Sequence, residues 1–244
     1  VLETFLSESK AEQSSSEISE ALGLNRGRVF RILYTLESRG YVRQDPQTKR
    51  YRLGMKLFEL GQAVARDFDL PRIAGPALAD LTAITGETSY VFALNGLEAM
   101  TIARQECSQP MRISAEVGRR HTLQIGAACN CILAYMPADA IDRVLGDGPL
   151  PRVAPKTPPD AAAVKRKLAE IRRLGYHLSE EEDQEGISAV AAPIRDAGAS
   201  VIAAVALAMP SSRFLPEKLP VFIRETVNAA RRMSAEMGCP THDL

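Results

Sequence analysis

The chain has 244 residues, 45% of them hydrophobic and 25% charged, a composition typical of globular domains and not of long disordered segments. Its 30 basic and 30 acidic residues give a formal net charge of zero, which excludes a protein that binds polyanions over its whole surface. The four cysteines show no disulfide or CxxC spacing, and no signal peptide or long apolar run is present. We therefore expect a cytoplasmic protein that does not enter a membrane.

The first forty residues predict three helices. Residues 1–8 have the apolar period of a helix, and a serine run before residues 17–22 supplies the N-cap of a short second helix that Gly23 ends. Residues 24–39 predict a third helix, with Asn25 as its N-cap. The apolar residues of this third helix form one stripe: Val29, Ile32, Leu33 and Leu36.

Positive charge is concentrated on and after the third helix. Arg26, Arg28 and Arg31 crowd its first half, where the helix dipole favours anions over cations. Residues 24–56 hold nine Lys and Arg against two acidic residues, a local charge of +7 in a neutral chain. A nucleic acid partner would offset this unfavourable placement, because its phosphates and base edges can bind the arginine side chains. We therefore predict that the helix enters the major groove of DNA.

A basic hairpin follows the third helix. Residues 41–44 and 49–53 alternate around an Asp-Pro turn, which predicts two short strands. Helix, short helix, basic helix and basic hairpin is the order of a winged helix-turn-helix, and we assign residues 1–54 to this domain. We expect base contacts from Asn25, Arg26, Arg28 and Arg31, and phosphate or minor-groove contacts from Arg43, Lys49, Arg50 and Arg52.

Two features of this domain leave alternatives open. The basic face could be an ordinary solvated helix surface. Gly27, in the first turn of the third helix, costs up to about 1 kcal/mol of helix stability relative to alanine. The glycine could serve to let the backbone approach the duplex.

The rest of the chain alternates helices with strands. Residues 55–69 predict a helix that links the domains semi-rigidly, and residues 70–244 predict an α+β domain. Its predicted helices are 73–85, 127–135, 138–145, 160–174 and 221–237, with a proline-rich connection at 148–159. Its predicted strands are 89–94, 99–106, 111–116, 176–178, 188–195 and 200–209.

Several motifs along the chain occur together in a known family. Gly-Tyr-Val-Arg-Gln-Asp-Pro at 40–46, running into Arg-Tyr-Arg-Leu-Gly at 50–54, resembles the wing of the isocitrate lyase regulator (IclR) family of bacterial transcription factors. Four later stretches match in the same order: 85–88, 117–120, 173–176 and 191–194. The resemblance implies a GAF-like effector-binding fold for residues 70–244. It also implies a homodimer or a dimer of dimers that binds a small effector, often a carboxylate or aromatic acid.

The chain departs from the family pattern where the effector is expected. Residues 124–130 replace a segment that often reads His-Ala-Thr-x-x-Gly-Lys, and Ser179-Glu180 and Ser188-Ala189 replace Asp-Asp and Arg-Cys. These replacements make the expected pocket less polar. A less polar pocket implies an effector that is larger or more apolar than the small oxoacids bound by the regulator that gave the family its name. Candidate effector-binding residues are Tyr90, Phe92, Gln124, Ile125, Ala128, Cys129, Ser179, Ser188, Ala189 and Leu207, each of which could instead be plain core.

No enzymatic motif appears, and no cofactor or metal is expected. The chain lacks G-x-S-x-G, H-E-x-x-H and P-loop patterns. Cys129 and Cys131 with His121 or His177 would be a zinc site only as an alternative to buried thiols. The acidic segment 180–185 could be a solvated turn or pair across a subunit interface.

Together these features predict a ligand-responsive transcriptional regulator, more readily a repressor than an activator, of a catabolic or metabolic operon. Its partners would be a pseudo-palindromic double-stranded operator, a small organic acid or related metabolite, and further copies of the chain. Effector binding would change the spacing or order of the DNA-binding heads. The alternatives are a constitutive repressor without an effector, or a GAF-like sensor or enzyme.

Overall fold

The computed structural model describes residues 1–6, 11–67, 69–114, 116–146 and 148–240, without the side chains of 62–67. The chain divides into two compact units, Val1–Phe68 and Asp69–Leu244. This division places the helix that follows the wing with the first unit, whereas the sequence suggested a separate linker at residues 55–69.

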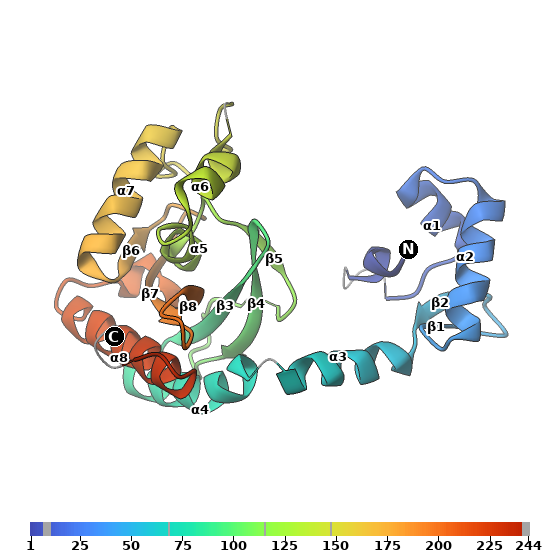
Figure 1. The fold of residues 1–244 in the computed structure, drawn as a ribbon, viewed down its shortest axis with the longest axis horizontal. Helices are drawn as coiled ribbons and strands as arrows, with labels where there is room; N and C mark the ends of the chain where they lie inside the picture. The colour runs from blue at the N-terminus through green and yellow to red at the C-terminus, as the bar shows by residue number, and fades with distance from the viewer. Residues whose placement is uncertain (7–10, 68, 115, 147, 241–244) are drawn as a thin grey trace. The chain divides into compact units, whose positions relative to one another are not determined.

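The first unit is a helical domain with a short hairpin (Figure 1). Its elements are the 3-10 helix η1 (Leu2–Phe5), α1 (Ser15–Leu22), α2 (Arg26–Ser38), β1 (Val42–Gln44), β2 (Tyr51–Leu53) and α3 (Met55–Asp67). The prediction of a helix over 1–8 was wrong in extent: a single 3-10 turn forms, and residues 7 and 8 lie outside the described residues. β1 and β2 pair antiparallel, with Arg43 opposite Arg52.

Local signals set the limits of α1 and α2. Ser14 and Glu17 form a reciprocal capping box at the start of α1, and Gly23 ends the helix in the left-handed conformation at φ 62°. Asn25 then caps α2 by accepting a hydrogen bond from the Arg28 N–H at 2.8 Å. The unit closes around one small core: Phe5, Ile18, Val29, Leu33, Val42 and Tyr51.

Gly54 fixes where the wing ends. A Cβ on Gly54 would lie 2.1 Å from the carbonyl oxygen of Gly40, a backbone atom that cannot give way. The Gly54 N–H also donates to the Tyr41 carbonyl at 2.8 Å. Only glycine allows this close passage of two chain segments, so the exit from β2 into α3 depends on it.

The second unit is an α+β domain with one six-stranded sheet. Its helices are α4 (Leu70–Thr85), α5 (Ala127–Leu133), α6 (Ala138–Leu145), α7 (Ala161–Leu174), the 3-10 turn η3 (Ser211–Arg213) and α8 (Leu219–Glu236). Its strands are β3 (Thr88–Asn95), β4 (Glu98–Gln105), β5 (Arg120–Thr122), β6 (His177–Glu180), β7 (Ile187–Arg195) and β8 (Val201–Pro210). The sheet order is β5-β4-β3-β8-β7-β6, and every neighbouring pair is antiparallel.

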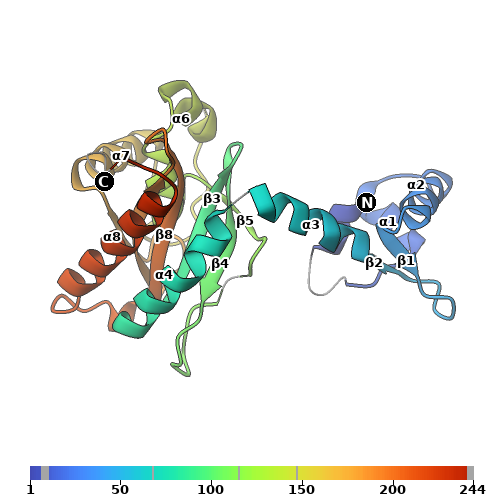
Figure 2. The same ribbon diagram turned by 60° about the horizontal axis from the view of Figure 1, so that its bottom comes forward.

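Helices cover both faces of this sheet (Figures 1 and 2). α5, α6 and α7 cover one face, where Ala99, Ala191, Ala204 and Ala206 of the strands pack against the apolar residues of these helices. α4 and α8 cover the other face. Ser89 of β3 points to this face, because its hydroxyl donates a hydrogen bond to the Leu78 carbonyl of α4 at 3.2 Å. Small alanines on the first face let α5 approach the strands closely.

One predicted strand is absent and one short strand was missed. Residues 111–114 and 116 form no strand, and Ala115 lies outside the described residues. Side chains bind the backbone there instead: Arg213 donates to the Met111 carbonyl at 3.0 Å, and the Tyr90 hydroxyl to the Ile113 carbonyl at 2.6 Å. The three-residue strand β5 was missed because its sequence, Arg-His-Thr, contains no apolar residue that could alternate with polar ones.

A bidentate ion pair ties the start of β3 to η3. Arg213 donates from Nε and Nη2 to the two carboxylate oxygens of Glu87, both at 2.7 Å. Glu87 is buried, and the geometry is the parallel fork that makes arginine–carboxylate pairs strong. The pair holds the 111–113 segment against the unit through the same arginine.

Candidate DNA interface and effector-binding region

The surface of α2 that faces away from the core is basic and aromatic. Arg26, Arg28 and Arg31 are exposed, as the sequence predicted for contacts to DNA. Phe30 and Tyr34, which were not among the predicted DNA contacts, are 57% and 66% exposed on the same helix. Their positions outside the stripe of Val29, Ile32, Leu33 and Leu36 were the signal that could have found them, because two exposed aromatic side chains are unusual on a helix without a partner.

Gly27 lies in the first turn of α2. A Cβ there would have only one described contact, Asn25 Oδ1 at 3.7 Å, which is ordinary van der Waals contact. The described residues of the domain therefore leave room for a side chain at this position.

The wing presents two of its predicted phosphate contacts to solvent. Arg43 and Lys49 are exposed, and Lys49 has φ 58°, a left-handed conformation that non-glycine residues rarely adopt. Backbone N–H groups of Thr48 and Gln47 donate to the Asp45 carboxylate and lower its pKa. These hydrogen bonds hold the conformation of the turn, and the side chains of Arg43 and Lys49 remain available for contacts to phosphates.

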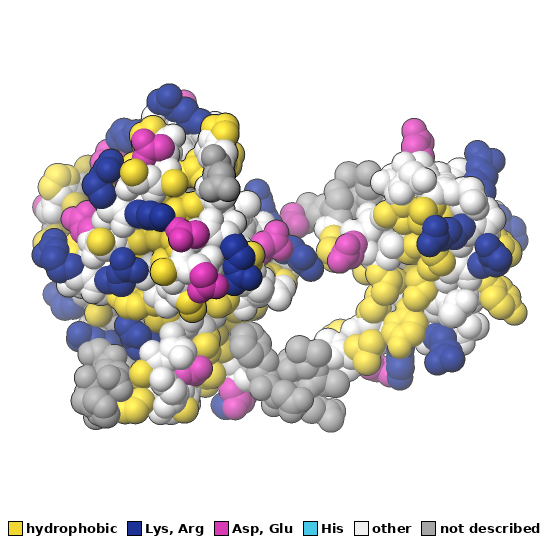
Figure 3. All heavy atoms as spheres, turned by 45° about the horizontal axis from the view of Figure 1, so that its top comes forward, with side chains coloured by type: hydrophobic (Ala, Val, Ile, Leu, Met, Phe, Trp, Pro, Cys, Tyr) yellow, Lys and Arg dark blue, Asp and Glu magenta, His cyan; other side chains and the backbone are white. Residues whose placement is uncertain are grey.

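Arg50 and Arg52 have partners inside the unit. Arg50 Nη2 lies 2.8 Å from Glu17 Oε2 and 3.0 Å from the Glu12 carbonyl oxygen, and Arg52 forms an ion pair with the Glu12 carboxylate. Hydrogen bonds from the Ser14 backbone, followed by Arg50, lower the pKa of Glu17 to about 2. These two arginines, predicted as phosphate contacts, fasten β2 to the start of α1. Figure 3 shows Lys and Arg side chains beside hydrophobic ones on the visible face of this unit.

In the second unit, aromatic candidates for effector binding meet on the sheet face toward α5. Tyr90 and Phe92 share that face, with ring centroids 6.1 Å apart. His121, which the sequence analysis did not include among effector residues, packs edge-on to Phe92 at 5.0 Å and bonds Thr101 at 3.0 Å. Burial, and then the charge of Arg119, lowers the pKa of His121, which favours the neutral ring.

Predicted residues around the start of α5 lie near the acidic segment. Ile125, Ala128 and Cys129 are buried, and Gln124 is half-buried. The Asp183 carboxylate approaches Gly126, where it would lie 3.8 Å from an added Cβ. Burial, with Asp183 as the second cause, raises the pKa of Cys129 to about 12, so this thiol is protonated at neutral pH.

The remaining candidates divide between the two faces of the sheet. Ser179 and Ala189 are directly paired and share the face of Tyr90, through the register of β6, β7, β8 and β3. Ser188 and Leu207 pair with Met209 and Ser89, on the face toward α4. Ser188 was a candidate because Ser188-Ala189 stands where the family often has Arg-Cys, but adjacent residues of one strand face opposite sides of the sheet. In this arrangement Ser188 and Leu207 belong to the α4 side of the core.

Cys129, Cys131, His121 and His177 were considered as an alternative zinc site. Among the described residues, no three His, Cys, Asp or Glu are grouped so that they could hold a metal ion. Cys131 is fully buried, and burial raises the pKa of its thiol.

The acidic segment 180–185 forms ion pairs within the α+β unit. Lys156 lies 2.8 Å from Glu180, and Lys167 lies 2.5 Å from Glu182.

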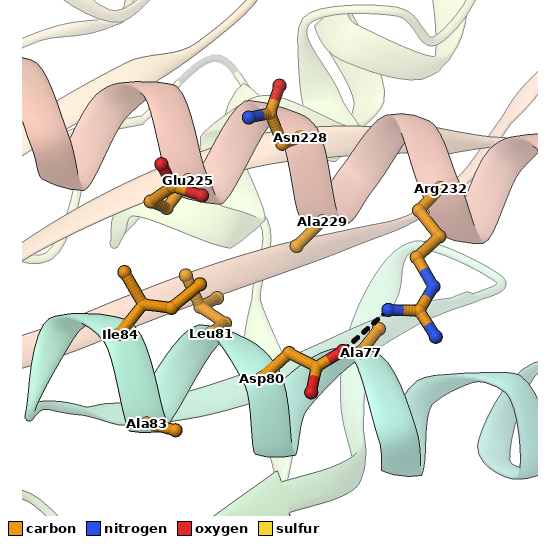
Figure 4. A pocket seen from close by; sticks show the side chains of 9 residues that line it. All are labelled: Ala77, Asp80, Leu81, Ala83, Ile84, Glu225, Asn228, Ala229 and Arg232. Carbon is orange, nitrogen blue, oxygen red and sulfur yellow. Dashed lines mark hydrogen bonds and ion pairs between the residues drawn. The ribbon is translucent and has the colours of Figure 1, made fainter.

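A groove of about 310 Å³ runs between α4 and α8 (Figure 4). Ala77 and Ala229 let the helices approach each other, and Arg232 bridges them with an ion pair to Asp80 at 2.6 Å. Glu225 and Arg232 give the groove both signs of charge. Its features are those of two packed helices, and none of the expected effector residues lines it.

Comparisons with known proteins give consistent matches. The family model described as IclR helix-turn-helix domain matches residues 1–46, and that described as bacterial transcriptional regulator IclR C-terminal matches residues 62–235. The chain is 33% identical over 237 residues to the HTH-type transcriptional repressor AllR of Klebsiella pneumoniae, covering 96% of this chain and 86% of that one. None of the described helices is both long and apolar enough to cross a lipid bilayer.

Solved structures share the fold over nearly the whole chain. An IclR transcriptional regulator from Alicyclobacillus acidocaldarius is 29% identical with a TM-score of 0.86, covering 97% of this chain and 95% of that one. An IclR homologue from Microbacterium hydrocarbonoxydans, solved in complex with 4-hydroxybenzoate, is 23% identical with a TM-score of 0.85. That match covers 97% of this chain and 95% of the other.

Proposed function

Because the chain belongs to the IclR family of bacterial transcriptional regulators, we propose that it is a repressor whose affinity for its operator is set by a small organic acid. The family and the relatives of this chain are transcriptional regulators and not enzymes. The proposed target is a catabolic or metabolic operon, and the proposed place of action is the cytoplasm, where the operator is.

The observation that carries the DNA-binding part is the exposed surface of α2. Arg28 and Arg31 are exposed on a helix that Asn25 caps, and no ion pair with a described residue occupies either guanidinium group. Arginine can bond guanine O6 and N7 bidentately, and an aromatic ring such as Phe30 can contact a thymine methyl group. Arg43 and Lys49 would meet phosphates and fix the register of the helix.

We propose that two protomers read one pseudo-palindrome. A single α2 covers one half-site, so a homodimer or a dimer of dimers would bind half-sites roughly 34–36 Å apart or a multiple of that. The operator sequence should therefore have approximate two-fold symmetry.

The effector part is supported by the aromatic surroundings of Tyr90, Phe92 and His121. The 4-hydroxybenzoate complex of a family homologue shows an aromatic acid bound by that protein. An aromatic acid would suit a surface built from rings and alanines better than a small oxoacid, because more of its apolar area could be buried. We propose an effector of this class.

The test begins by selecting genomic DNA fragments on the full chain and footprinting the enriched sequences at a fixed salt concentration. We expect a protected pseudo-palindrome close to a promoter. Arg28→Ala should lose about 1–3 kcal/mol of operator affinity, since it removes a base contact and leaves the Asn25 cap to the backbone intact. Arg166→Ala, an exposed arginine of α7, is the matched control and should bind as the wild type does.

Two results would contradict the proposal. Enrichment of no sequence above random fragments would remove specific DNA binding. Equal operator affinity of Arg28→Ala and wild type would remove the role given to α2.

A further inference from the structure

A second cavity of the α+β unit, of about 290 Å³, opens between the end of α7, the edge of β7 and α8. β6 pairs with β7 only as far as His177 opposite Ala191, so residues 192–195 extend past the end of β6. Pro193 suits such an edge because it has no N–H to donate to a neighbouring strand. The cavity therefore lies where the sheet stops and the helices do not fully close over it.

Arginine dominates this cavity. Its described lining contains four arginines and no acidic residue: Arg172, Arg173, Arg195 and Arg231. They come from three elements far apart in the sequence, so the fold brings them together and no local charge run does. Like charges in a concave surface repel one another, and the repulsion lowers stability unless an anion offsets it.

Two of the guanidinium groups are held in place by neutral groups. Arg195 lies 4.6 Å from the centroid of the Tyr135 ring and donates to the Ala199 carbonyl at 2.9 Å. Arg172 donates to the Ala134 carbonyl at 2.7 Å. Neither contact neutralises a charge, and each leaves further N–H donors of the guanidinium unused.

The other two have little or no compensation from carboxylates. Arg173 lies 3.9 Å from Glu170, and both side chains are well exposed, so solvent screens that pair. Arg231 is exposed and forms no ion pair with any residue that the structure describes. Cations in the last turn of α7 interact favourably with the helix dipole, which gives a structural reason for Arg172 and Arg173. The dipole of α7 gives no such reason for Arg195 or Arg231.

We propose that this cavity is a second ligand site, which binds a small polyanion: a metabolite bearing a phosphate group or two carboxylates. The planar guanidinium fork can donate two parallel hydrogen bonds to two oxygens of a carboxylate or of a phosphate group. The volume is at the lower end for small-molecule sites, which fits a compact metabolite. None of the ten residues expected to bind the effector lines it, so it is separate from the effector region.

The experiment measures binding of pyrophosphate and of succinate to the full chain by isothermal titration calorimetry, at constant ionic strength. Pyrophosphate represents phosphate-bearing ligands, and succinate represents dicarboxylates. The anion that binds with the higher affinity therefore identifies the class of ligand. The Arg173→Gln/Arg231→Gln variant should bind the preferred anion at least about tenfold more weakly. Arg231→Lys, which keeps the charge but loses the fork, should bind with intermediate affinity.

The matched control is Arg166→Gln, which removes one exposed charge from α7 outside the cavity. Circular dichroism of each variant checks that the unit is folded. The proposal fails if the wild type binds neither anion up to about 10 mM, or if the Arg166→Gln variant loses as much affinity as the double variant. It also fails if the double variant keeps anion binding and instead loses operator affinity, which would make the arginines DNA contacts. Operator binding by the wild type is measured separately, so failure of this proposal is distinguishable from failure of the proposed function.

Discussion

At the scale of single residues, the placement of each side chain separates recognition from support. Arg28 and Arg31 are exposed on α2, whereas Arg50 and Arg52 of the same basic segment are bound to Glu17 and Glu12. The sequence shows only that these residues are arginines within a positive run. Their acidic partners lie more than thirty residues earlier, so the distinction requires the fold.

Gly27→Ala separates stability from DNA binding. An added Cβ meets only Asn25 Oδ1 at 3.7 Å, so alanine should stabilise the helix by up to about 1 kcal/mol. If the backbone approaches the duplex at this position, the same methyl group weakens operator binding. Thermal unfolding and operator titration of the one variant measure both effects. An operator affinity equal to that of the wild type would show that the backbone does not approach DNA there.

His177 should make the second unit sensitive to acid. Burial, and then the charge of Lys167, lowers the pKa of His177 to about 3, whereas the histidine of the unfolded chain titrates near its ordinary pKa of 6.5. The unfolded state therefore binds a proton that the folded state does not, and stability falls as the pH decreases from about 6.5 toward 3. The slope is at most about 1.4 kcal/mol per pH unit for one proton.

The check is chemical denaturation of the second unit's signal across this pH range. His177→Asn removes the titrating group, so its stability should depend less steeply on pH, whatever its absolute value. An unchanged slope in this variant would assign the acid sensitivity to other groups.

At the scale of elements, α2 has two faces with separate tasks. Val29 and Leu33 are fully buried in the small core of the first unit, and Phe30 and Tyr34 are exposed outside that buried stripe. The apolar period in the sequence predicted the buried face. The pattern leaves Phe30 and Tyr34 off the buried stripe, but it carries no information about what an exposed aromatic side chain contacts.

Leu33→Ala should destabilise the first unit alone. Truncating a fully buried leucine costs about 2–5 kcal/mol, and this unit has few other buried side chains to compensate. Hydrogen exchange should show faster exchange of amides in α1, α2 and the hairpin, with the second unit unchanged. Thr35→Ala, an exposed site on the same helix, is the control and should leave exchange near the wild-type rate. Equal protection in Leu33→Ala would show that this core does not hold the unit together.

The wing should act through phosphates. Arg43→Ala removes an exposed cation from β1 without removing a described ion pair. Affinity should fall by a similar factor for the operator and for unrelated duplexes, and the slope of log K against log salt should decrease by about 1. Anisotropy titrations at several salt concentrations measure the slope. A loss confined to the operator would instead make Arg43 a base contact.

At the scale of the whole molecule, strong local signals predicted most elements, and weak ones failed. Asn25 and Gly23 mark element ends that the structure reproduces. The described residues of 111–116 form no strand; Arg213 and Tyr90, which lie far away in sequence, bind the Met111 and Ile113 carbonyls instead. Ser188 and Leu207 face α4 because strand order and register, which a single sequence does not contain, decide the face.

The central claim is that one unit reads DNA under the control of a small acid bound by the other. The most direct measurement is fluorescence anisotropy of a labelled operator duplex titrated with the full chain, with and without 4-hydroxybenzoate and a panel of related aromatic acids. The account predicts that at least one acid changes operator affinity about 5- to 150-fold, the usual range of allosteric coupling, with less effect on a scrambled duplex. Tight operator binding that no acid alters would contradict it and leave a constitutive repressor.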